Sequence, residues 1–260
     1  MLTSLQNPLV KQARKLHQSK GRKNQQLLLL EGTHLLEEAF ANSYPLETVF
    51  CTDRWQEKHR QLWEDLSQHA ARVELVSPKV LEAIATTVNP DGAIATAPQK
   101  AKDSPIVTSL GLALETIQDP GNLGTIIRTA TATDTEGLLL SSDSADLDHP
   151  KVLRASAGAW FKLPMGVTVD LAGQLNRYRQ QGMQVVAAVP NAQLSYWEIN
   201  LREPTIILLG NEGTGLSEKA IALADKKISI PLSRGIESLN VAISAALILY
   251  EAQRQRLCQL

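Results

Sequence analysis

Short apolar runs alternate with helix-like stretches along the first hundred residues. Apolar runs of this length, bounded by polar or turn-forming residues, predict buried strands, and they lie at residues 27–31, 48–51, 73–76 and 93–96. Apolar positions at helical spacing predict helices at residues 8–19, 32–41, 53–70 and 78–86. This part of the chain therefore predicts a compact α/β unit.

The alternation is more regular in the rest of the chain. Strands are predicted at residues 112–117, 137–141, 184–189, 205–209 and 227–230. Helices are predicted at residues 123–132, 150–157, 171–181, 217–224 and 239–256. Apolar strands that alternate with helices indicate a largely parallel sheet covered on both faces. Ligands of such sheets bind at the carboxyl ends of the strands.

A polar stretch with a proline at each end, residues 97–105, separates these two parts. We therefore expect a smaller α/β domain at residues 1–98, a linker at residues 99–108 and a second α/β domain at residues 109–260. A chain of 260 residues has room for both.

Composition is that of an ordinary globular protein, with 43% hydrophobic and 20% charged residues. No apolar run is long enough for a membrane span, and the N-terminus lacks the pattern of a signal peptide. Cys51 and Cys258 lie far apart without metal-ligand spacing, which favours reduced thiols in a cytoplasmic protein and no bound metal. The net charge of −1 hides an uneven distribution, because residues 1–30 hold six basic residues and no acidic one. That segment is a candidate surface for contacting phosphates.

Three polar motifs follow predicted strands. The first, at residues 119–130, contains a Pro-Gly turn, Asn122 as a candidate helix cap, and Arg128 one turn beyond Gly124. The second, at residues 210–217, places Glu212 among three glycines. It matches neither a dinucleotide-binding nor a P-loop pattern, which disfavours a dehydrogenase. Taken alone, the first motif could be a capped helix with a surface arginine, and the second could be a glycine-rich turn with an exposed glutamate.

The third motif, at residues 230–241, ends a strand and leads into the last helix, with Ser238 as a candidate cap. Residues 241–250 of that helix are apolar on nearly every side. A helix with one buried face would show a polar stripe. We therefore expect it to be buried against the sheet and against a second copy of the chain, or else wholly within one chain.

Together, the three motifs resemble the SpoU/TrmH family of RNA ribose 2′-O-methyltransferases, over residues 111–256. Residues 5–32 resemble the family's accessory substrate-binding domain, which is akin to a ribosomal protein fold. The resemblance implies a trefoil-knotted catalytic domain, S-adenosylmethionine as cofactor and a homodimer. It also implies an RNA substrate, ribosomal RNA, with transfer RNA or a non-catalytic RNA-binding or ribosome-assembly role as alternatives.

The resemblance also assigns roles to individual residues. It implies a catalytic set consisting of Asn122, Arg128, Glu212, Ser238 and Asn240. It implies cofactor contacts, largely through the backbone, from Leu209, Gly210, Ile230, Leu239, Asn240 and Val241. RNA contacts are expected from the basic N-terminal segment and from residues 151–160, which resemble the family and are expected to face substrate. These candidates are Lys11, Arg14, Arg22, Lys23 and Arg154. One departure from the family pattern lies at residues 131–134, beyond Asn122 and Arg128.

Overall fold

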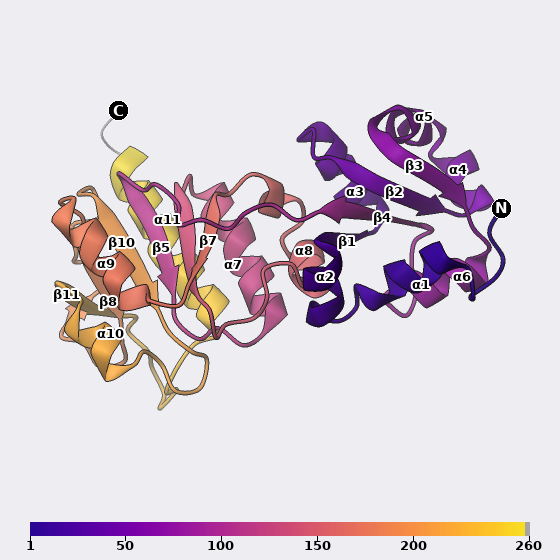
Figure 1. Cartoon of the computed structure of the whole chain (residues 1–260). Helices are drawn as coiled ribbons and strands as arrows, with labels where there is room; N and C mark the ends of the chain where they lie inside the picture. Colours follow the sequence, from indigo (N-terminus) through magenta and orange to yellow (C-terminus); the bar gives the residue numbers. More distant parts are fainter. Residues whose placement is uncertain (258–260) are drawn as a thin grey trace. The chain divides into compact units, whose positions relative to one another are not determined.

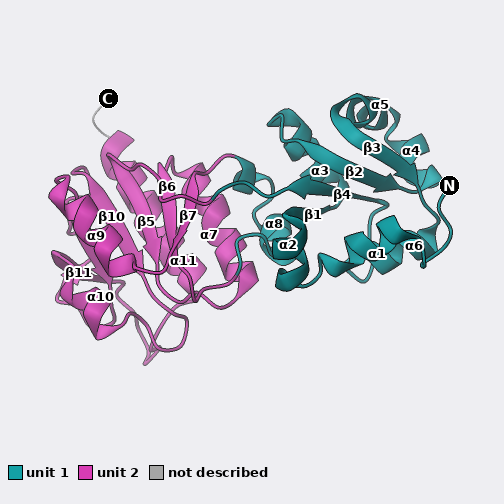
Figure 2. Cartoon of the chain, in the orientation of Figure 1, with its two compact units in different colours: residues 1–101, 146–161 teal, residues 102–145, 162–260 magenta. Residues whose placement is uncertain are grey.

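The computed structural model describes residues 1–257 of the chain, so Cys258 lies outside the described residues. Two compact units are present (Figure 2). Unit 1 comprises Met1–Ala101 together with Asp146–Phe161, and unit 2 comprises Lys102–Ala145 and the chain from Lys162 onward. Residues 146–161, which the sequence placed in the second domain, thus belong to the N-terminal unit. The sequence-based domain boundaries stay a prediction.

Unit 1 is built on a four-stranded sheet in the order β1-β4-β2-β3 (Figure 1). Its strands are β1 (Leu27–Glu31), β2 (Leu46–Cys51), β3 (Ala70–Leu75) and β4 (Ala93–Pro98). Its helices are α1 (Pro8–Lys15), α2 (Ser19–Gln25), α3 (Thr33–Ala41), α4 (Asp53–Lys58), α5 (Arg60–His69), α6 (Pro78–Ile84) and α8 (Pro150–Ala155), followed by a 3₁₀ turn at Ala159–Phe161. β4 pairs antiparallel with both of its neighbours, whereas β2 and β3 are parallel.

The predicted helix at residues 8–19 is wrong in extent, because α1 ends at Lys15 and a second helix, α2, begins at Ser19 and continues to Gln25. The backbone N–H groups of Leu16, His17 and Gln18 donate to carbonyls three residues earlier, which ends α1 in a tighter turn. Arg22, on α2, donates to the carbonyl oxygens of Leu16 and His17 and so satisfies this break. Similarly, the predicted helix at residues 53–70 is two helices that meet at His59.

Unit 2 contains a seven-stranded sheet in the order β7-β6-β5-β10-β8-β11-β9, and every neighbouring pair is parallel. The strands are β5 (Leu110–Leu114), β6 (Gly137–Ser141), β7 (Met165–Thr168), β8 (Gln184–Ala188), β9 (Leu194–Ser195), β10 (Thr205–Leu209) and β11 (Lys226–Ser229). The helices are α7 (Pro120–Ala132), α9 (Leu171–Gln180), α10 (Glu218–Ala222) and α11 (Val241–Leu257). The predicted α/β class and parallel sheet are confirmed; the short strands β7 and β9 were not predicted.

Helices cover both faces of this sheet (Figure 1). On one face, α9 and α10 pack against alternate residues of the central strands, such as Ala113, Ile206 and Leu208. On the other face, α7 and α11 lie side by side. Their N-terminal ends meet where Asn240 bonds Asn122, and further along Gln253 bonds the Ala132 carbonyl, so the two helices run in the same direction.

The strand register brings the first two motifs together. Leu114, the last residue of β5, pairs with Leu209, the last residue of β10. The two loops that follow, residues 115–119 and 210–217, therefore start next to each other at the carboxyl edge of the sheet, where ligands bind in folds of this kind. The trefoil knot that the family resemblance implies stays a prediction.

Candidate active site

Glu212 lies at the centre of the contacts between these two loops. Its carboxylate accepts hydrogen bonds from the backbone N–H groups of Gln118 and Asp119, each at 3.2 Å. It accepts a third from the side-chain amide of Asn122, at 3.1 Å. Glu212 thus holds the first motif in place from the second motif, across the β5–β10 boundary.

These contacts keep Glu212 ionised. Partial burial of the carboxyl group raises its pKa, but the hydrogen bonds from Asn122, Gln118 and Asp119 together outweigh that effect and leave the pKa below its usual value. A carboxylate with a lowered pKa and three donors is a weak proton acceptor. The geometry therefore suits Glu212 to orienting Asn122 and the loop before it, and not to acting as a base.

The third motif joins the same cluster through Asn240. Its side-chain amide donates to the Asn122 side-chain oxygen at 2.9 Å, while its own oxygen accepts from the backbone N–H of Ala242 at 2.9 Å. Asn240 therefore caps α11, and the expectation that Ser238 would do so is wrong. Asn122 does not cap α7 either, since the Asp119 side chain accepts the N–H of Asn122. Asn122 is thereby left to link Glu212 and Asn240.

The loop of the second motif is fixed by its own backbone. Asn211 and Gly215 exchange two backbone hydrogen bonds, each of 3.0 Å, and the Asn211 side-chain amide donates to the Thr116 carbonyl at 2.8 Å. A Cβ atom on Gly210 would lie 2.4 Å from the backbone of Gly215 and Leu216. Glycine is thus required at Gly210 because the loop folds back on itself, before any ligand is considered.

A cavity of about 600 Å³ lies beside this cluster, at the carboxyl ends of β8, β10 and β11. Its lining includes nearly all of the predicted cofactor contacts, namely Leu209, Gly210, Ile230, Leu239 and Val241. Glu212 and Ser238 also line it, whereas Asn240 is not among the lining residues. The walls combine apolar side chains with several polar or charged ones, such as Asn211, Glu212 and Lys227.

Arg128 stands apart from the cluster. It lies six residues beyond Asn122 on α7, or about 9 Å along the helix axis. Its side chain is exposed and has no hydrogen bond or ion pair within residues 1–257. Gly124, one turn before Arg128, is buried on α7 while Arg128 is exposed.

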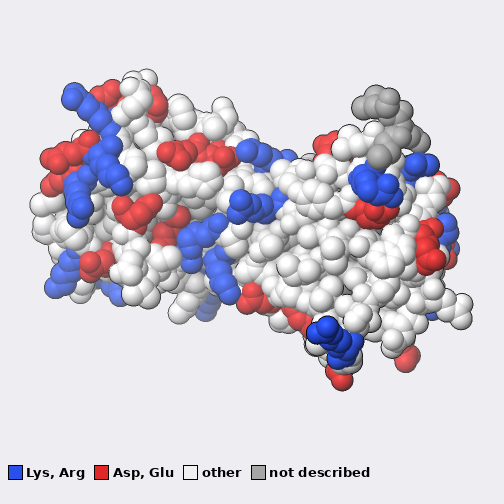
Figure 3. Space-filling model, turned by 180° about the vertical axis from the view of Figure 1, so that it is seen from behind, with Lys and Arg blue, Asp and Glu red and all other residues white. Residues whose placement is uncertain are grey.

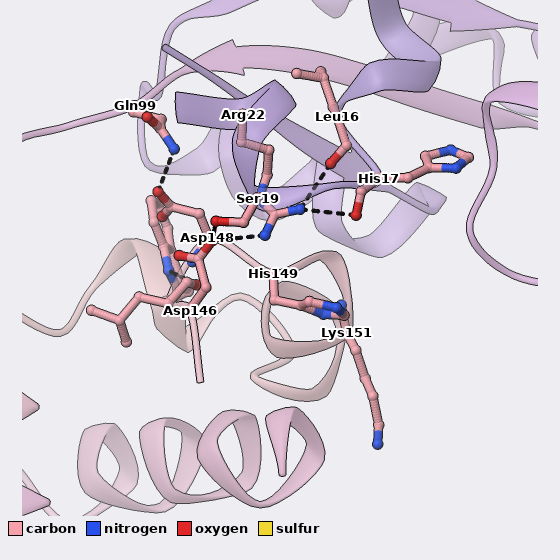
Figure 4. Close-up of polar contacts among 11 residues, drawn as sticks. Leu16, His17, Ser19, Arg22, Gln99, Asp146, Asp148, His149 and Lys151 are labelled. Atoms are coloured by element: carbon pink, nitrogen blue, oxygen red, sulfur yellow. Dashed lines mark hydrogen bonds and ion pairs between the residues drawn. The ribbon is translucent and has the colours of Figure 1, made fainter. Parts of the chain in front are cut away.

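The predicted RNA contacts fall into two groups. Lys11, Arg14 and Lys23 are exposed on α1 and α2. Arg22 is only 1% exposed and pairs with Asp146 (Figure 4), so its assignment as a phosphate contact is wrong for this structure. Arg154 bonds the carboxylate of Glu31 at 2.8 Å and keeps part of its guanidinium exposed. Basic and acidic side chains are interspersed over the face shown in Figure 3.

Sequence reasoning missed two residues of the site. Asp119 was passed over although an acidic residue before Pro-Gly is a typical helix N-cap. Asn211 was passed over although its side-chain oxygen accepts the N–H groups of Gly213 and Thr214, the local turn that an Asn-x-Gly sequence favours. The contacts of Gln118 are made by its backbone, and no sequence signal points to them.

The described part of the chain offers few other candidates for a reactive or metal-binding site. Cys51 is buried, and its burial, with a smaller contribution from Asp53, raises the thiol pKa to about 12, so it remains a thiol. Among residues 1–257, no three His, Cys, Asp or Glu side chains are grouped as a metal site would need. Within the same range, no helix has the length and apolar character to cross a membrane.

Comparison with known families identifies both parts of the chain. Residues 109–250 match the model of the SpoU rRNA Methylase family. Residues 7–95 match the model of an MRM3-like substrate binding domain. The two matches fall on either side of the polar stretch at residues 97–105.

Relatives align along almost the whole chain. An uncharacterized tRNA/rRNA methyltransferase of Synechocystis sp. is 48% identical, over 98% of this chain and 94% of the relative. The 23S rRNA (guanosine(2553)-2′-O)-methyltransferase RlmP of Bacillus subtilis is 30% identical, over 96% of this chain and 97% of its own. The AdoMet-bound rRNA methyltransferase from Sinorhizobium meliloti has a similar structure, with a TM-score of 0.85, 30% identity and 97% coverage of both chains. With a family match over more than half of its length and full-length relatives, the chain belongs to the SpoU rRNA Methylase family.

Proposed function

We propose that this protein transfers a methyl group from S-adenosylmethionine to a ribose 2′-hydroxyl of ribosomal RNA. The observation that carries the proposal is the chain of contacts from Glu212 through Asn122 to Asn240, beside the 600 Å³ cavity. It joins all three family motifs at the carboxyl edge of a parallel sheet. The family match and the full-length rRNA methyltransferase relative support ribosomal RNA as the substrate class.

The cavity fits the cofactor. Its volume lies within the range of about 300–1,000 Å³ that is usual for small-molecule sites. Apolar walls from Ile230, Leu239 and Val241 suit an adenine ring, and the backbone of Leu209 and Gly210 offers polar groups at the wall. When bound, S-adenosylmethionine supplies the methyl group on a sulfonium that needs no strong counter-charge. The AdoMet-bound rRNA methyltransferase of similar structure supports this assignment.

The reaction is an in-line displacement, in which the 2′-oxygen gains a bond to the methyl carbon as the sulfur–methyl bond breaks. The hydroxyl proton leaves to a phosphate oxygen of the RNA or to water. The exposed Arg128 guanidinium binds the adjacent phosphate and stabilises the negative charge that develops on the 2′-oxygen. Asn122, Asn240 and Ser238 position ribose and phosphate by hydrogen bonds, and the Glu212 carboxylate holds Asn122 in the required orientation.

Residues 1–98 form the RNA-binding domain in this proposal, joined by residues 99–108 to the catalytic domain at residues 109–260. Lys11, Arg14 and Lys23 present exposed charges from α1 and α2, and Lys15 and Lys20 add to them. Such charges bind the phosphate backbone without reading its sequence. We place the protein in the cytoplasm, because that is where a bacterial relative such as RlmP would meet its 23S rRNA.

The protein acts as a homodimer through α11. Three apolar side chains form a row along this helix, each more than half exposed, namely Ile243, Tyr250 and Leu257. The alternative that α11 is wholly buried within one chain is therefore wrong. A second copy seated on this row would cover it. Light scattering on an Ile243→Glu, Tyr250→Arg variant should then give a monomer, whereas Val169→Glu, at another exposed apolar residue, should leave a dimer.

The activity is tested by incubating the purified protein with labelled S-adenosylmethionine and either ribosomal or transfer RNA, followed by mapping of the labelled ribose. Label in ribosomal RNA is the expected result. Label confined to transfer RNA would correct the substrate class. Binding of RNA with no transfer to any RNA would point to the non-catalytic RNA-binding role.

Arg128 is tested in the same assay. Arg128→Ala should lower turnover by a factor on the order of a hundred, the scale for losing one charge-stabilising group, with cofactor affinity unchanged. Arg177 is a matched control, since it is an exposed arginine on α9, at the opposite face of the sheet. If Arg177→Ala lost as much turnover as Arg128→Ala, a general loss of surface charge and not the proposed role would explain the effect.

A further inference from the structure

The candidate cofactor cavity of unit 2 carries few charges, and only one of them is positive. Among the residues of the described range that line it, Lys227 is the only basic one, and Glu212 and Glu237 are the acidic ones. The Glu212 carboxylate already accepts hydrogen bonds from Asn122 and from the loop of the first motif. One positive and two negative side chains give the lining a net charge of −1.

The position of Lys227 on β11 brings it to the cavity. Successive side chains of a strand point to opposite faces of the sheet, so Lys226 and Lys227 do not share a face. Lys227 pairs in register with Ala187 of β8, and Ala188, the last residue of β8, lines the cavity together with Ile221 of α10. Figure 1 shows β8, β11 and α10 at the same end of unit 2. Lys226 is exposed as well, but it is not among the lining residues.

These charges match the amino-acid part of the proposed cofactor. S-adenosylmethionine carries a carboxylate, an ammonium group and a sulfonium, so it is a cation overall. Its two positive groups are compatible with a cavity lined by two glutamates. Its carboxylate is not, because a carboxylate near Glu212 and Glu237 would be repelled by both. Lys227 is the side chain of the lining whose charge can offset this repulsion.

We propose that Lys227 binds the carboxylate of S-adenosylmethionine and so selects a cofactor whose amino-acid group is intact. The inference rests on the proposed function. It adds a side-chain contact to a site in which the family resemblance implies largely backbone contacts. Lysine suits this role, since its ammonium group can donate to a carboxylate oxygen from a long, flexible side chain. Lys227 takes no part in the displacement itself.

The test measures the binding of two ligands by calorimetry. They are S-adenosylmethionine and its decarboxylated form, which keeps the ammonium and sulfonium groups and lacks only the carboxylate. The variants are Lys227→Gln, which removes the positive charge, and Lys227→Arg, which keeps it. Lys226→Gln is the matched control, because it removes the same charge from the neighbouring position of β11, which does not line the cavity.

Lys227→Gln should bind S-adenosylmethionine roughly three- to tenfold more weakly than wild type, between the scale of an exposed ion pair and that of a hydrogen bond between charged groups. It should bind the decarboxylated form at least as tightly as wild type does, because a positive charge no longer faces a cationic ligand. Lys227→Arg should keep most of the affinity for S-adenosylmethionine, and Lys226→Gln should bind both ligands like wild type.

Equal weakening for the two ligands in Lys227→Gln would overturn the proposal, since it would show damage to the cavity and not the loss of a carboxylate contact. Unchanged binding of S-adenosylmethionine in Lys227→Gln would overturn it too, as would the same weakening in Lys226→Gln. In each of these cases, binding of S-adenosylmethionine by wild type would leave the proposed function standing. If wild type binds neither ligand, the proposed function fails, and the assignment of Lys227 fails with it.

Discussion

Asn240 allows the stability of the site to be separated from its chemistry, because the oxygen and the nitrogen of its side-chain amide make different contacts. Its side-chain oxygen caps α11 by accepting the N–H of Ala242, and its amide donates to Asn122. Asn240→Ala removes both. Loss of an N-cap costs about 1 kcal/mol, and loss of a partly exposed hydrogen bond about 0.5–1.5 kcal/mol. A total of about 2 kcal/mol should lower the melting temperature by roughly 4–8 °C for a chain of this size.

Asn240→Asp removes only the donor. A carboxylate caps a helix as well as an amide oxygen and is favoured by the helix dipole, so only the lost bond to Asn122 should lower the stability, by about 0.5–1.5 kcal/mol. The new carboxylate would face the side-chain oxygen of Asn122 at the present 2.9 Å. Two acceptors cannot share a hydrogen bond, so Asn122 would turn its amide away from Glu212 or move. Turnover should therefore fall in Asn240→Asp although the cap of α11 is kept and the protein is more stable than Asn240→Ala.

The assay measures the melting temperature and single-turnover methylation of the same preparations. Asp170→Ala is the matched control, since Asp170 caps α9 in the same unit by accepting the N–H of Gly173 at 2.9 Å. It should lose about 1 kcal/mol of stability and keep full turnover. Wild-type turnover in Asn240→Asp would refute the argument that the donor to Asn122 organises the site, and an unchanged melting temperature in Asn240→Ala would refute the cap.

Three further outcomes follow from the same contacts. The lowered pKa of Glu212 means that its ionised form stabilises the fold above its usual pKa and that this contribution is lost as the pH falls through the lowered value. In urea unfolding, the excess stability of wild type over Glu212→Gln should thus shrink once the pH falls below the usual glutamate pKa and disappear below the lowered pKa of Glu212. Asp146→Ala should lower the stability in the same measurement by about 3–5 kcal/mol, because it leaves the charge of a 1% exposed guanidinium without its carboxylate partner. Gly210→Ala should weaken cofactor binding roughly tenfold or more in calorimetry, because the new methyl group would displace the backbone at Gly215.

Local sequence was sufficient to predict several strands and the edge of the sheet on which the candidate site lies. The strands at residues 27–31, 137–141 and 205–209 were predicted with the bounds that the structure shows, because each is a short apolar run between turn-forming residues. Parallel order followed from the alternation of strands with helices. The three motifs each follow a strand, so their common position at the carboxyl edge could be predicted before the strand order was known.

Contacts between distant parts of the chain decided the rest. Asn122 and Ser238 both have the residue type of a helix cap, but Asp119 and Asn240 take those positions, because only the packed loops show which side chain meets which N–H group. Arg22 looks like a surface residue in a basic helix. It is buried because its partner, Asp146, lies 124 residues further along the chain. A side chain's environment depends on what long-range folding places beside it, and the pattern of neighbouring residues carries little information about that.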